Sequence, residues 1–283
     1  MTMQINAADE AVSAGAVVDP GSGLVFVELS HEFGHYQPVQ PGYKDVVIRR
    51  VATHATHGVL TSHLVTVMHN GTHLNAPIHF ASGGLGVGEL PADLFLRQGV
   101  VLSVPKGEWE YIEPADLETA GADLIEPGDV VIVNTGWHHG YADSIEYFSH
   151  GPGLSLAAAQ WLLDKQAAMV GIDTASIDHP LATSLAQRHR VFPPIVVELP
   201  RRYLKRTGRT VEQDFPAWNP AHRLLHKAGV PTIENVGGEV DLMSGHRAAF
   251  HTAPWYWPQG DACIIRLVAI TDPQQSYRLE RGR

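Results

Sequence analysis

Short apolar runs alternate along the chain with amphipathic stretches, and glycine, proline or asparagine separates most of them. Short runs of β-branched and other apolar residues predict strands. We expect strands at residues 25–30, 46–56, 59–68, 100–104, 130–134, 169–172, 232–236 and 262–270. The second and third of these segments flank Gly58 and predict a long antiparallel hairpin.

Helices are indicated by their start and stop residues, and we expect them at 113–119, 155–166 and 219–229. Pro114 suits a first helical turn, because the backbone N–H that proline lacks would have no partner there. Ser155 and Asn219 are suitable N-caps, since their short polar side chains can accept from the first turn. Gly229 lies just past the end of the third helix, where glycine is preferred.

This alternation of strands and helices, without an internal repeat, predicts a single α/β domain. We place it at residues 24–283, after a small and polar segment at 1–23 that we expect to be a flexible N-terminus. Residues 181–218 form a basic, proline-rich excursion, which is either a solvated loop region or a lid or subunit-contact arm. Its basic residues are Arg188, Arg190, Arg201, Arg202, Lys205, Arg206 and Arg209.

Composition narrows the class of protein. At 283 residues, with 44% hydrophobic and 18% charged residues, the chain can bury a large globular core. Its formal net charge of −10 disfavours nucleic acid as a partner, because a phosphate backbone repels an acidic surface. No apolar run approaches the ~20 residues that span a bilayer, so we expect no membrane partner. The only cysteine, Cys263, lies in an apolar run; we expect a buried structural thiol and a cytoplasmic location.

The densest chemistry in the sequence lies in the segment His69–Phe80. Its histidines, His69, His73 and His79, surround a Gly-Thr turn and a proline, and imidazole is a common ligand of borderline metals. The glycine of that turn lets the first two imidazoles converge. If the chain is extended after His73, Asn75 lies on the same side and its amide oxygen can reach the same metal. His79 lies a little outside, where it is suited to hold a proton.

A metal held by ligands from this segment needs another ligand from elsewhere, and His222 and Glu234 are the best candidates. His222 lies in the first turns of the helix that Pro220 opens, and Glu234 lies in the following strand. Because a helix–turn–strand unit folds back on itself, these two side chains can face one point. Such a site would keep a water, lower its pKa to about 7 and deliver hydroxide to a carbonyl. His79 would protonate the leaving group.

These residues resemble the metal-binding motif of the cyclase family of metal-dependent hydrolases, which includes bacterial kynurenine formamidase and isatin hydrolase. The similarity runs in order from about residue 25 to residue 270 and so covers nearly the whole chain. It is carried by His69-x-Gly71-Thr72-His73-x-Asn75-x-Pro77-x-His79-Phe80, Leu29-Ser30-His31, Gly128-Asp129, Thr135-Gly136-Trp137, Gly171-Ile172-Asp173-Thr174, Ser176-Ile177-Asp178, His222-x-Leu224-Leu225 and Ile233-Glu234-Asn235.

The resemblance implies a swivelling β/β/α fold and a homo-oligomer, such as a homodimer or homotetramer. It also implies Mn²⁺- or Zn²⁺-dependent opening of an amide, lactam or lactone carbonyl. The family pattern assigns metal ligation to the positions that His69, His73 and Asn75 occupy here. In members with two metals it adds the positions of His222 and Glu234.

The sequence departs from the family pattern at Asn75, where the family has aspartate. A carboxylate can bridge two cations and offset their charge, whereas an amide offers one neutral oxygen. The change should weaken metal affinity and disfavour a bridged pair, so we expect one ion per subunit. Three accounts of Asn75 stay open: a natural mononuclear variant, an engineered change, and a chain that has lost hydrolytic activity.

We predict a metal-dependent amidohydrolase that opens a carbon–nitrogen bond of a small aromatic amide or lactam. We expect His79 and Glu234 to be catalytic, and the family pattern gives His79 the acid/base role. The side chains expected to line the substrate pocket are His31, Trp137, His138, His139 and Tyr141. The alternatives are a lactone hydrolase or polyketide-type cyclase/dehydratase on the same fold, and a non-catalytic ligand-binding relative, which only Asn75 suggests.

Overall fold

The computed structural model describes residues 15–187 and 194–277. The strands are β1 (Ala16–Val18), β2 (Val25–Glu28), β3 (Val47–Ala52), β4 (Thr61–Val65), β5 (His73–Asn75), β6 (Leu96–Ser103), β7 (Tyr111–Ile112), β8 (Val130–Asn134), β9 (Gly153–Leu154), β10 (Met169–Ile172), β11 (Thr232–Glu234), β12 (Arg247–His251), β13 (Ala262–Ile264) and β14 (Val268–Thr271). The helices are α1 (His54–His57), α2 (Pro114–Gly121), α3 (Ile145–His150), α4 (Leu156–Asp164), α5 (Glu198–Thr207), α6 (Val211–Asp214) and α7 (Pro220–Lys227). No helix within the described ranges has the length and apolar character needed to cross a membrane.

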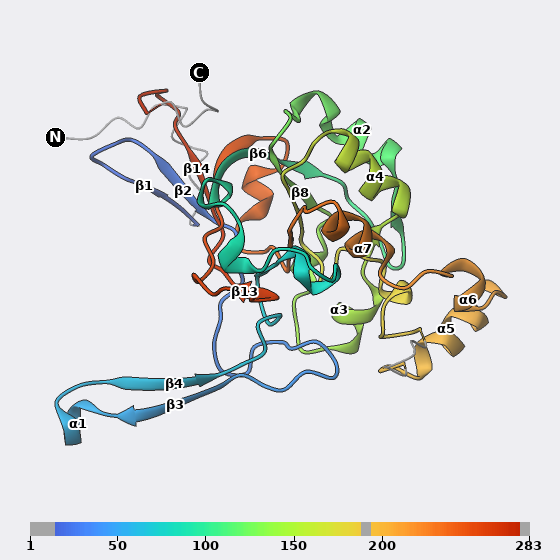
Figure 1. Ribbon diagram of the computed structural model, residues 1–283, viewed down its shortest axis with the longest axis horizontal. Helices are drawn as coiled ribbons and strands as arrows, with labels where there is room; N and C mark the ends of the chain where they lie inside the picture. Colours follow the sequence, from blue (N-terminus) through green and yellow to red (C-terminus); the bar gives the residue numbers. More distant parts are fainter. Residues whose placement is uncertain (1–14, 188–193, 278–283) are drawn as a thin grey trace, which may run out of the picture.

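Ten strands form one mixed sheet in the order β1-β2-β14-β12-β6-β8-β10-β11-β5-β13. The central strands β6, β8, β10 and β11 run parallel, and the strands on either side of them pair antiparallel. Parallel neighbours need long crossover connections, and α2, α4 and α7 lie in those connections (Figure 1). The expected α/β class is confirmed.

The central strands are buried on both faces, because alternate side chains enter two different cores. On β6, Val100 and Leu102 pack against the helices together with Leu162 of α4 and Leu225 of α7. Val101, between them, points to the opposite face and enters the other core. Fully buried apolar runs such as β8 are the consequence of this double burial.

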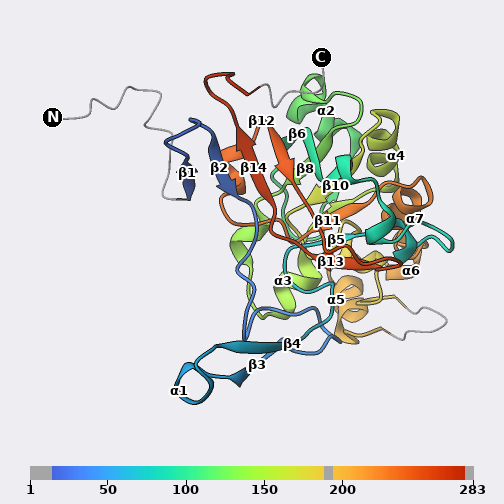
Figure 2. The ribbon, with the colours of Figure 1, turned by 60° about the vertical axis from the view of Figure 1, so that its left-hand side comes forward.

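The second core shows that the sheet curls. It joins Val27 of β2 and Cys263 of β13, although these strands lie near opposite ends of the sheet order. Figure 2 shows the antiparallel strands β2, β14 and β12 beside the central strands. Cys263 is fully buried and unpaired, as expected for a structural thiol.

Two parts of the sheet differ from the sequence expectation. Residues 16–18, which we assigned to the flexible N-terminus, form β1 and pair with β2, so the fold begins before residue 24. Residues 1–14 lie outside the described residues. The expected strand 262–270 is two strands: β13 pairs with β5, whereas β14 pairs with β12 and β2. The chain must bend to change partners, and a continuous apolar run gives no sign of such a bend.

The predicted hairpin is confirmed and projects from the body of the molecule. β3 pairs antiparallel with β4, and α1 forms the tip. Figure 1 shows this arm extending well away from the ten-stranded sheet. Its apolar side chains are exposed, including Val51, Leu60 and Val65. The arm thus presents apolar surface without an intramolecular partner.

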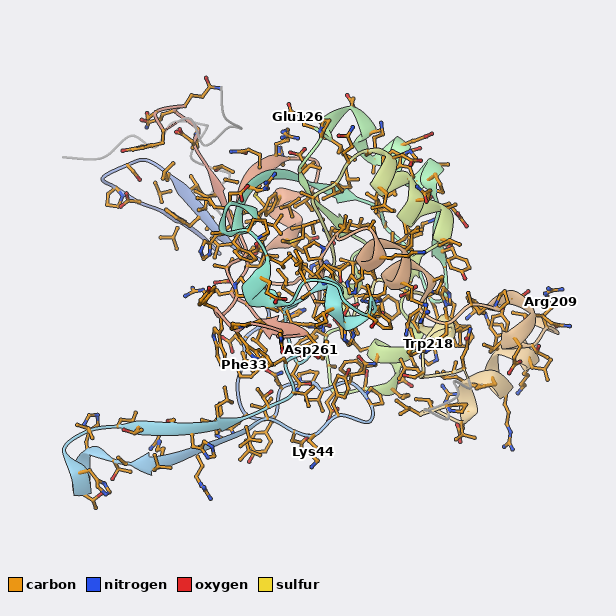
Figure 3. The ribbon with its side chains drawn as sticks, viewed as in Figure 1. Phe33, Lys44, Glu126, Arg209, Trp218 and Asp261 are labelled. Atoms are coloured by element: carbon orange, nitrogen blue, oxygen red, sulfur yellow. The ribbon has the colours of Figure 1, made fainter. Side chains whose placement is uncertain are left out.

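The basic excursion at 181–218 is folded where the structure describes it. Helices α5 and α6 form a small lobe whose own core includes Leu185, Leu199 and Phe215. Arg209 lies at the outer end of this lobe (Figure 3). Arg188 and Arg190 of the expected basic stretch lie outside the described residues.

Candidate metal centre

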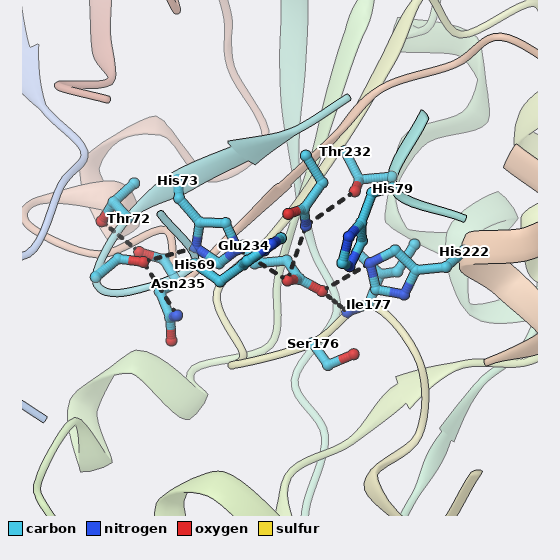
Figure 4. Close-up of polar contacts among 12 residues, drawn as sticks. His69, Thr72, His73, His79, Ser176, Ile177, His222, Thr232, Glu234 and Asn235 are labelled. Carbon is cyan, nitrogen blue, oxygen red and sulfur yellow. Dashed lines mark hydrogen bonds and ion pairs between the residues drawn. The ribbon is translucent and has the colours of Figure 1, made fainter. Parts of the chain in front are cut away.

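The expected metal ligands gather around β5, which lies between β11 and β13. Side chains alternate along a strand, so Leu74 enters the apolar core while His73 and Asn75 face the other way. The register pairs His73 with Glu234 and Asn75 with Thr232. Directly opposed residues share one face of a sheet. His73, Asn75 and Glu234 therefore converge on the same side of the sheet, and Figure 4 shows His73 facing Glu234.

Glu234 lies at the centre of this group and is buried. Its Oε2 accepts a hydrogen bond from Asn75 Nδ2 at 2.9 Å and lies 3.2 Å from His73 Nε2. Its Oε1 accepts from the backbone N–H of Ile177 at 2.8 Å and lies 3.1 Å from His222 Nε2. The structure thus brings together four of the five expected ligands. The carboxylate of Glu234 lies at the centre, and His73, Asn75 and His222 contact it.

The ring orientations direct one nitrogen of each imidazole at Glu234. With protons assigned to Nδ1, His73 donates to the carbonyl of Gly71 at 2.9 Å and His222 donates to Asp178 Oδ2 at 2.7 Å. Apart from their ion pairs with Glu234, the Nε2 atoms of both rings are buried without a partner, and Oδ1 of Asn75 is buried with no hydrogen bond. Such atoms are rare in folded proteins. Imidazole nitrogens with carboxylate and amide oxygens form a donor set that suits zinc or manganese, so these residues fit the metal that the resemblance implies.

Helix α7 and one buried carboxylate fix the position of His222. Asp178 accepts from the backbone N–H groups of Ala221 at 2.7 Å and His222 at 3.1 Å, as well as from the His222 ring. The expected capping by Asn219 is wrong: this residue has φ 46°, and its side chain makes no capping bond. Asp178 replaces it because an anion is favoured at a helix N-terminus. The same carboxylate therefore caps α7 and orients the ring.

The charges of Glu234 and the two imidazoles are coupled. Burial alone would lower the pKa of His222, but the facing Glu234 and the hydrogen bond to Asp178 raise that pKa to about 9. Burial would likewise raise the pKa of Glu234, but His222 and His73 hold it well below its usual range. Without a metal, a proton on His222 balances the buried carboxylate. A bound cation would take the place of that proton.

Asn75 has a definite electrostatic role here. Besides its bond to Glu234, its Nδ2 lies 3.4 Å from Thr232 Oγ1. An aspartate at this position would set two carboxylates against each other, which requires a proton or a cation between them. The amide removes that requirement. This contact is a physical reason for the weaker metal binding that we expect of the chain.

His69 and His79 lie beside this group together with Asp261, a carboxylate that our sequence analysis missed. His69 Nε2 is 3.0 Å and His79 Nδ1 is 4.0 Å from Asp261 Oδ2. The rings of His69 and His73 are 5.3 Å apart. The hydrogen bond from His69 lowers the pKa of Asp261 to about 2. One ligand atom from each of His69, His79 and Asp261 lies within 4.8 Å of the others, as a shared metal requires.

His79 ends a short 3-10 helix, Pro77–His79, and its side chain is partly open to solvent. Burial, together with the nearby His69 and His222, lowers the pKa of His79 to about 3. The ring is therefore neutral near pH 7, and its lowered pKa makes it a weaker base than an ordinary imidazole. This protonation state suits the base half of the acid/base role that we expect.

Tyr43 also faces the centre, and no motif in the sequence marks it. Its ring lies 6.2 Å from that of His69. Burial, and then the negative charges of Glu234 and Asp261, raise the pKa of Tyr43 to about 12. The hydroxyl therefore keeps its proton and can donate a hydrogen bond. Tyr43 lies in the loop between β2 and β3, which only the tertiary fold brings to this place.

Three of the five side chains expected to line the substrate pocket, His31, Trp137 and Tyr141, differ in their surroundings. His31 and Tyr141 stack with ring centroids 3.7 Å apart, and His31 Nε2 and the Tyr141 hydroxyl are buried without hydrogen-bond partners. The backbone N–H of His31 donates to Thr72 Oγ1 at 3.0 Å, which links the pair to the histidine segment. Trp137 instead donates its ring N–H to the carbonyl of Tyr147 at 2.9 Å. Its donor is thus already used within the fold.

A family model of cyclases matches residues 27–179, a little over half of the chain. Kynurenine formamidase of Bordetella avium is 30% identical over 138 residues, which are 47% of this chain and 61% of that protein. The matched part therefore spans about three fifths of this relative's length.

Solved structures extend the likeness to nearly the whole fold. Isatin hydrolase A from Ralstonia solanacearum superposes with a TM-score of 0.69 at 18% identity, over 88% of this chain and 92% of that one. A predicted metal-dependent hydrolase from Bacillus stearothermophilus gives a TM-score of 0.62 at 20% identity, over 87% and 98%. These structures share the fold, and the matched segment contains the histidine motif. The chain belongs to the cyclase family.

Proposed function

We propose that the protein is a metal-dependent hydrolase that opens the carbon–nitrogen bond of a small aromatic amide or lactam. The observation that carries this proposal is the convergence of buried ligand atoms on Glu234: Nε2 of His73 and of His222 face its carboxylate at 3.2 and 3.1 Å, and Oδ1 of Asn75 lies beside them without a hydrogen-bond partner. Burying polar atoms without partners costs stability, so a fold that keeps them together is expected to bind something there. The named activities of the formamidase and isatin hydrolase relatives support a carbonyl substrate bearing nitrogen.

We propose one Mn²⁺ or Zn²⁺ per subunit. When bound, such an ion would polarise a carbonyl oxygen and make a water acidic. Asp261 is hydrogen-bonded to His69 at the rim of the metal centre. Its carboxylate provides a negative charge there, whereas the amide of Asn75 is neutral. The residues that would hold the ion are His69, His73, Asn75, His222 and Glu234.

His79 is the proposed proton carrier. As a neutral imidazole, it takes a proton from the attacking water and returns it to the leaving nitrogen. Glu234 acts beside it, because its charge keeps the His73 and His222 rings directed at the reacting group. Tyr43, whose hydroxyl stays protonated, is positioned to donate a hydrogen bond to the substrate.

Aromatic side chains support an aromatic substrate. The ring of Phe80 lies 4.8 Å from that of His222 and 5.6 Å from that of Trp218. Flat rings prefer offset or edge-on contacts with other rings. The pair His31 and Tyr141 offers a second aromatic surface with free polar atoms.

The test combines elemental analysis of the purified protein with hydrolysis of N-formyl aromatic amines, cyclic amides and lactones. We expect zinc or manganese to copurify, and turnover of amides or lactams to disappear on chelation and in His73→Ala. Undiminished activity after exhaustive chelation would overturn the proposal. Turnover of lactones alone would favour the alternative lactone hydrolase. Binding without turnover, with activity restored by Asn75→Asp, would favour a non-catalytic relative.

We propose further that the protein is a homodimer or homotetramer, located in the cytoplasm. The exposed apolar side chains of the β3–β4 arm support self-association, because large unpartnered apolar surfaces often mark interfaces. The buried, unpaired thiol of Cys263 is in keeping with a reducing compartment.

A further inference from the structure

A second cluster of metal-ligating side chains lies at the end of β8 and shares no residue with the metal centre. His138 and His139 belong to a 3-10 helix, Trp137–Gly140, and Asp241 belongs to another, Val240–Met243. One ligand atom from each of the three residues lies within 4.8 Å of the other two. Two sequence-distant loops thus bring two imidazoles and a carboxylate to one place.

The spacing of these atoms matches a coordination shell. His139 Nε2 lies 3.0 Å and His138 Nε2 lies 3.5 Å from Asp241 Oδ2. Ligand atoms bound to zinc at about 2.0–2.2 Å lie about 3–3.5 Å from one another. The longer separation exceeds an ordinary N–H···O hydrogen bond. Both separations fall within the range that a shared cation needs, although the shorter one is also that of an ordinary ion pair.

His138 is held as metal-ligating histidines usually are. Its Nδ1 lies 3.0 Å from Oδ2 of Asp173, which also accepts from the backbone N–H of His138 at 3.3 Å. The other oxygen of Asp173 accepts from the backbone and the hydroxyl of Thr135 at 3.0 and 2.7 Å. Asp173 is completely buried. A carboxylate on one ring nitrogen fixes the tautomer and turns the other nitrogen's lone pair toward the metal, and here that second nitrogen faces Asp241.

Asp241 is held in a similar way. Its Oδ1 accepts from Asn134 Nδ2 at 2.7 Å, and the same amide donates to Ser244 Oγ at 2.9 Å. This bond fixes the carboxylate and leaves Oδ2 directed at the two imidazoles. Asn134 is the last residue of β8, so the sheet itself positions this ligand.

Charge and exposure also suit a cation. With neutral imidazoles, Asp173 and Asp241 leave two negative charges in the cluster, which one divalent ion would neutralise. His139 is 67% exposed and Asp241 is 51% exposed, so an ion and its waters can reach them. The other imidazole, His138, is buried and supplies the rigid part of the site.

We propose that His138, His139 and Asp241 bind a divalent cation of the zinc type, at a second site independent of the proposed catalytic metal. Three protein ligands leave one or more positions for water. A bound ion would join the loop after β8 to the segment between β11 and β12. It would thereby stabilise two loops at the edge of the sheet.

The experiment is a Zn²⁺ titration by calorimetry, with elemental analysis after gel filtration. We expect His139→Ala to hold one zinc equivalent fewer than the wild-type protein, or to bind it at least about tenfold more weakly. Asp241→Asn should lose the same equivalent. His251→Ala is the matched control, because His251 is an exposed histidine at the end of β12 and its loss should leave zinc binding unchanged.

The variant His73→Ala distinguishes zinc binding at the metal centre from zinc binding at this second site. We expect that variant to keep the binding step that His139→Ala loses. Equal zinc content and equal zinc affinity in the wild-type protein and in His139→Ala would overturn the proposal. His138 would then be a protonated partner of Asp173 and Asp241. Loss of the same step in His73→Ala would overturn it too, because the equivalent would then belong to the metal centre.

Discussion

The hydrogen bond between Asn75 and Glu234 joins an amide to a carboxylate at the point where the resemblance implies a second acid. The amide satisfies Glu234 without a cation, while its own Oδ1 stays unpartnered. One atom of difference between asparagine and aspartate therefore changes how strongly the centre requires a metal.

Asn75→Asp should bind Zn²⁺ more tightly than the wild-type protein. The added charge attracts the cation, whereas in the metal-free protein it faces Glu234 and should lower the free energy of unfolding by about 1–3 kcal/mol. Calorimetric titration and urea unfolding with and without zinc measure the two effects. A variant with unchanged zinc affinity and unchanged metal-free stability would contradict this account of position 75.

His222 should make the metal-free protein less stable as the pH rises. The pKa of His222 is raised to about 9 in the folded state, and that of an unfolded histidine is about 6.5. The ion pair with Glu234 therefore stabilises the fold fully below pH about 6.5, and this stabilisation is lost as the pH rises through about 9. Urea unfolding across that range measures the decline. His222→Gln should remove it, and an equal decline in that variant would assign the effect to other groups.

The same proton competes with the metal. Zinc affinity should increase with pH up to about 9, because the cation must displace the proton from His222. Calorimetry in buffers of different ionisation enthalpy counts the protons released. Binding that releases no proton near pH 7 would mean that His222 is not a ligand.

At the scale of single elements, helix α7 depends on a carboxylate from another segment. Asp178→Asn should weaken zinc binding by about 10- to 100-fold, because the His222 ring loses its orienting partner. It should also destabilise the protein by about 1–2 kcal/mol through loss of the cap. Zinc calorimetry and urea unfolding measure both effects.

Asp116→Asn is the matched control for that change. Asp116 accepts from the backbone N–H of Glu113 at 2.8 Å in the first turn of α2 and pairs with Lys106 at 2.8 Å, and it belongs to neither proposed metal site. It should lose stability to a similar extent with no change in zinc affinity. If the two variants affect zinc binding equally, Asp178 acts only through stability.

Most elements could be predicted from local signals. Pro114 and Ser155 mark the starts of α2 and α4, and the apolar run of β8 reflects burial on both faces. The histidine segment likewise indicated the metal chemistry, because its ligands are close in sequence. Asp178 appeared only within one of the matching motifs, and neither its role nor Asp261 could be found in this way. They reach the site through a loop and a strand pairing that no short pattern encodes.

At the scale of the whole molecule, the β3–β4 arm is the main exposed apolar surface that we assign to self-association. Leu60→Glu should shift the oligomer toward smaller species, because a charge in an apolar interface is costly to bury. Light scattering during gel filtration measures the mass. Leu204→Glu is the control, since Leu204 is 47% exposed on α5 and Leu60 is 52% exposed on the arm. An unchanged mass in Leu60→Glu would argue against the arm as the contact.

The position of β5 has a consequence for biosynthesis. Its two pairing strands come late: Thr232 follows Asn75 by 157 residues, and β13 follows β11. A ribosome therefore releases the histidine segment long before either neighbour exists, and contacts of such sequence separation form slowly. In the nascent chain, β5 therefore has no neighbouring strand to pair with until translation is almost finished. Truncated products should accordingly lack the centre altogether, and quality control could recognise them by an unpaired, histidine-bearing strand.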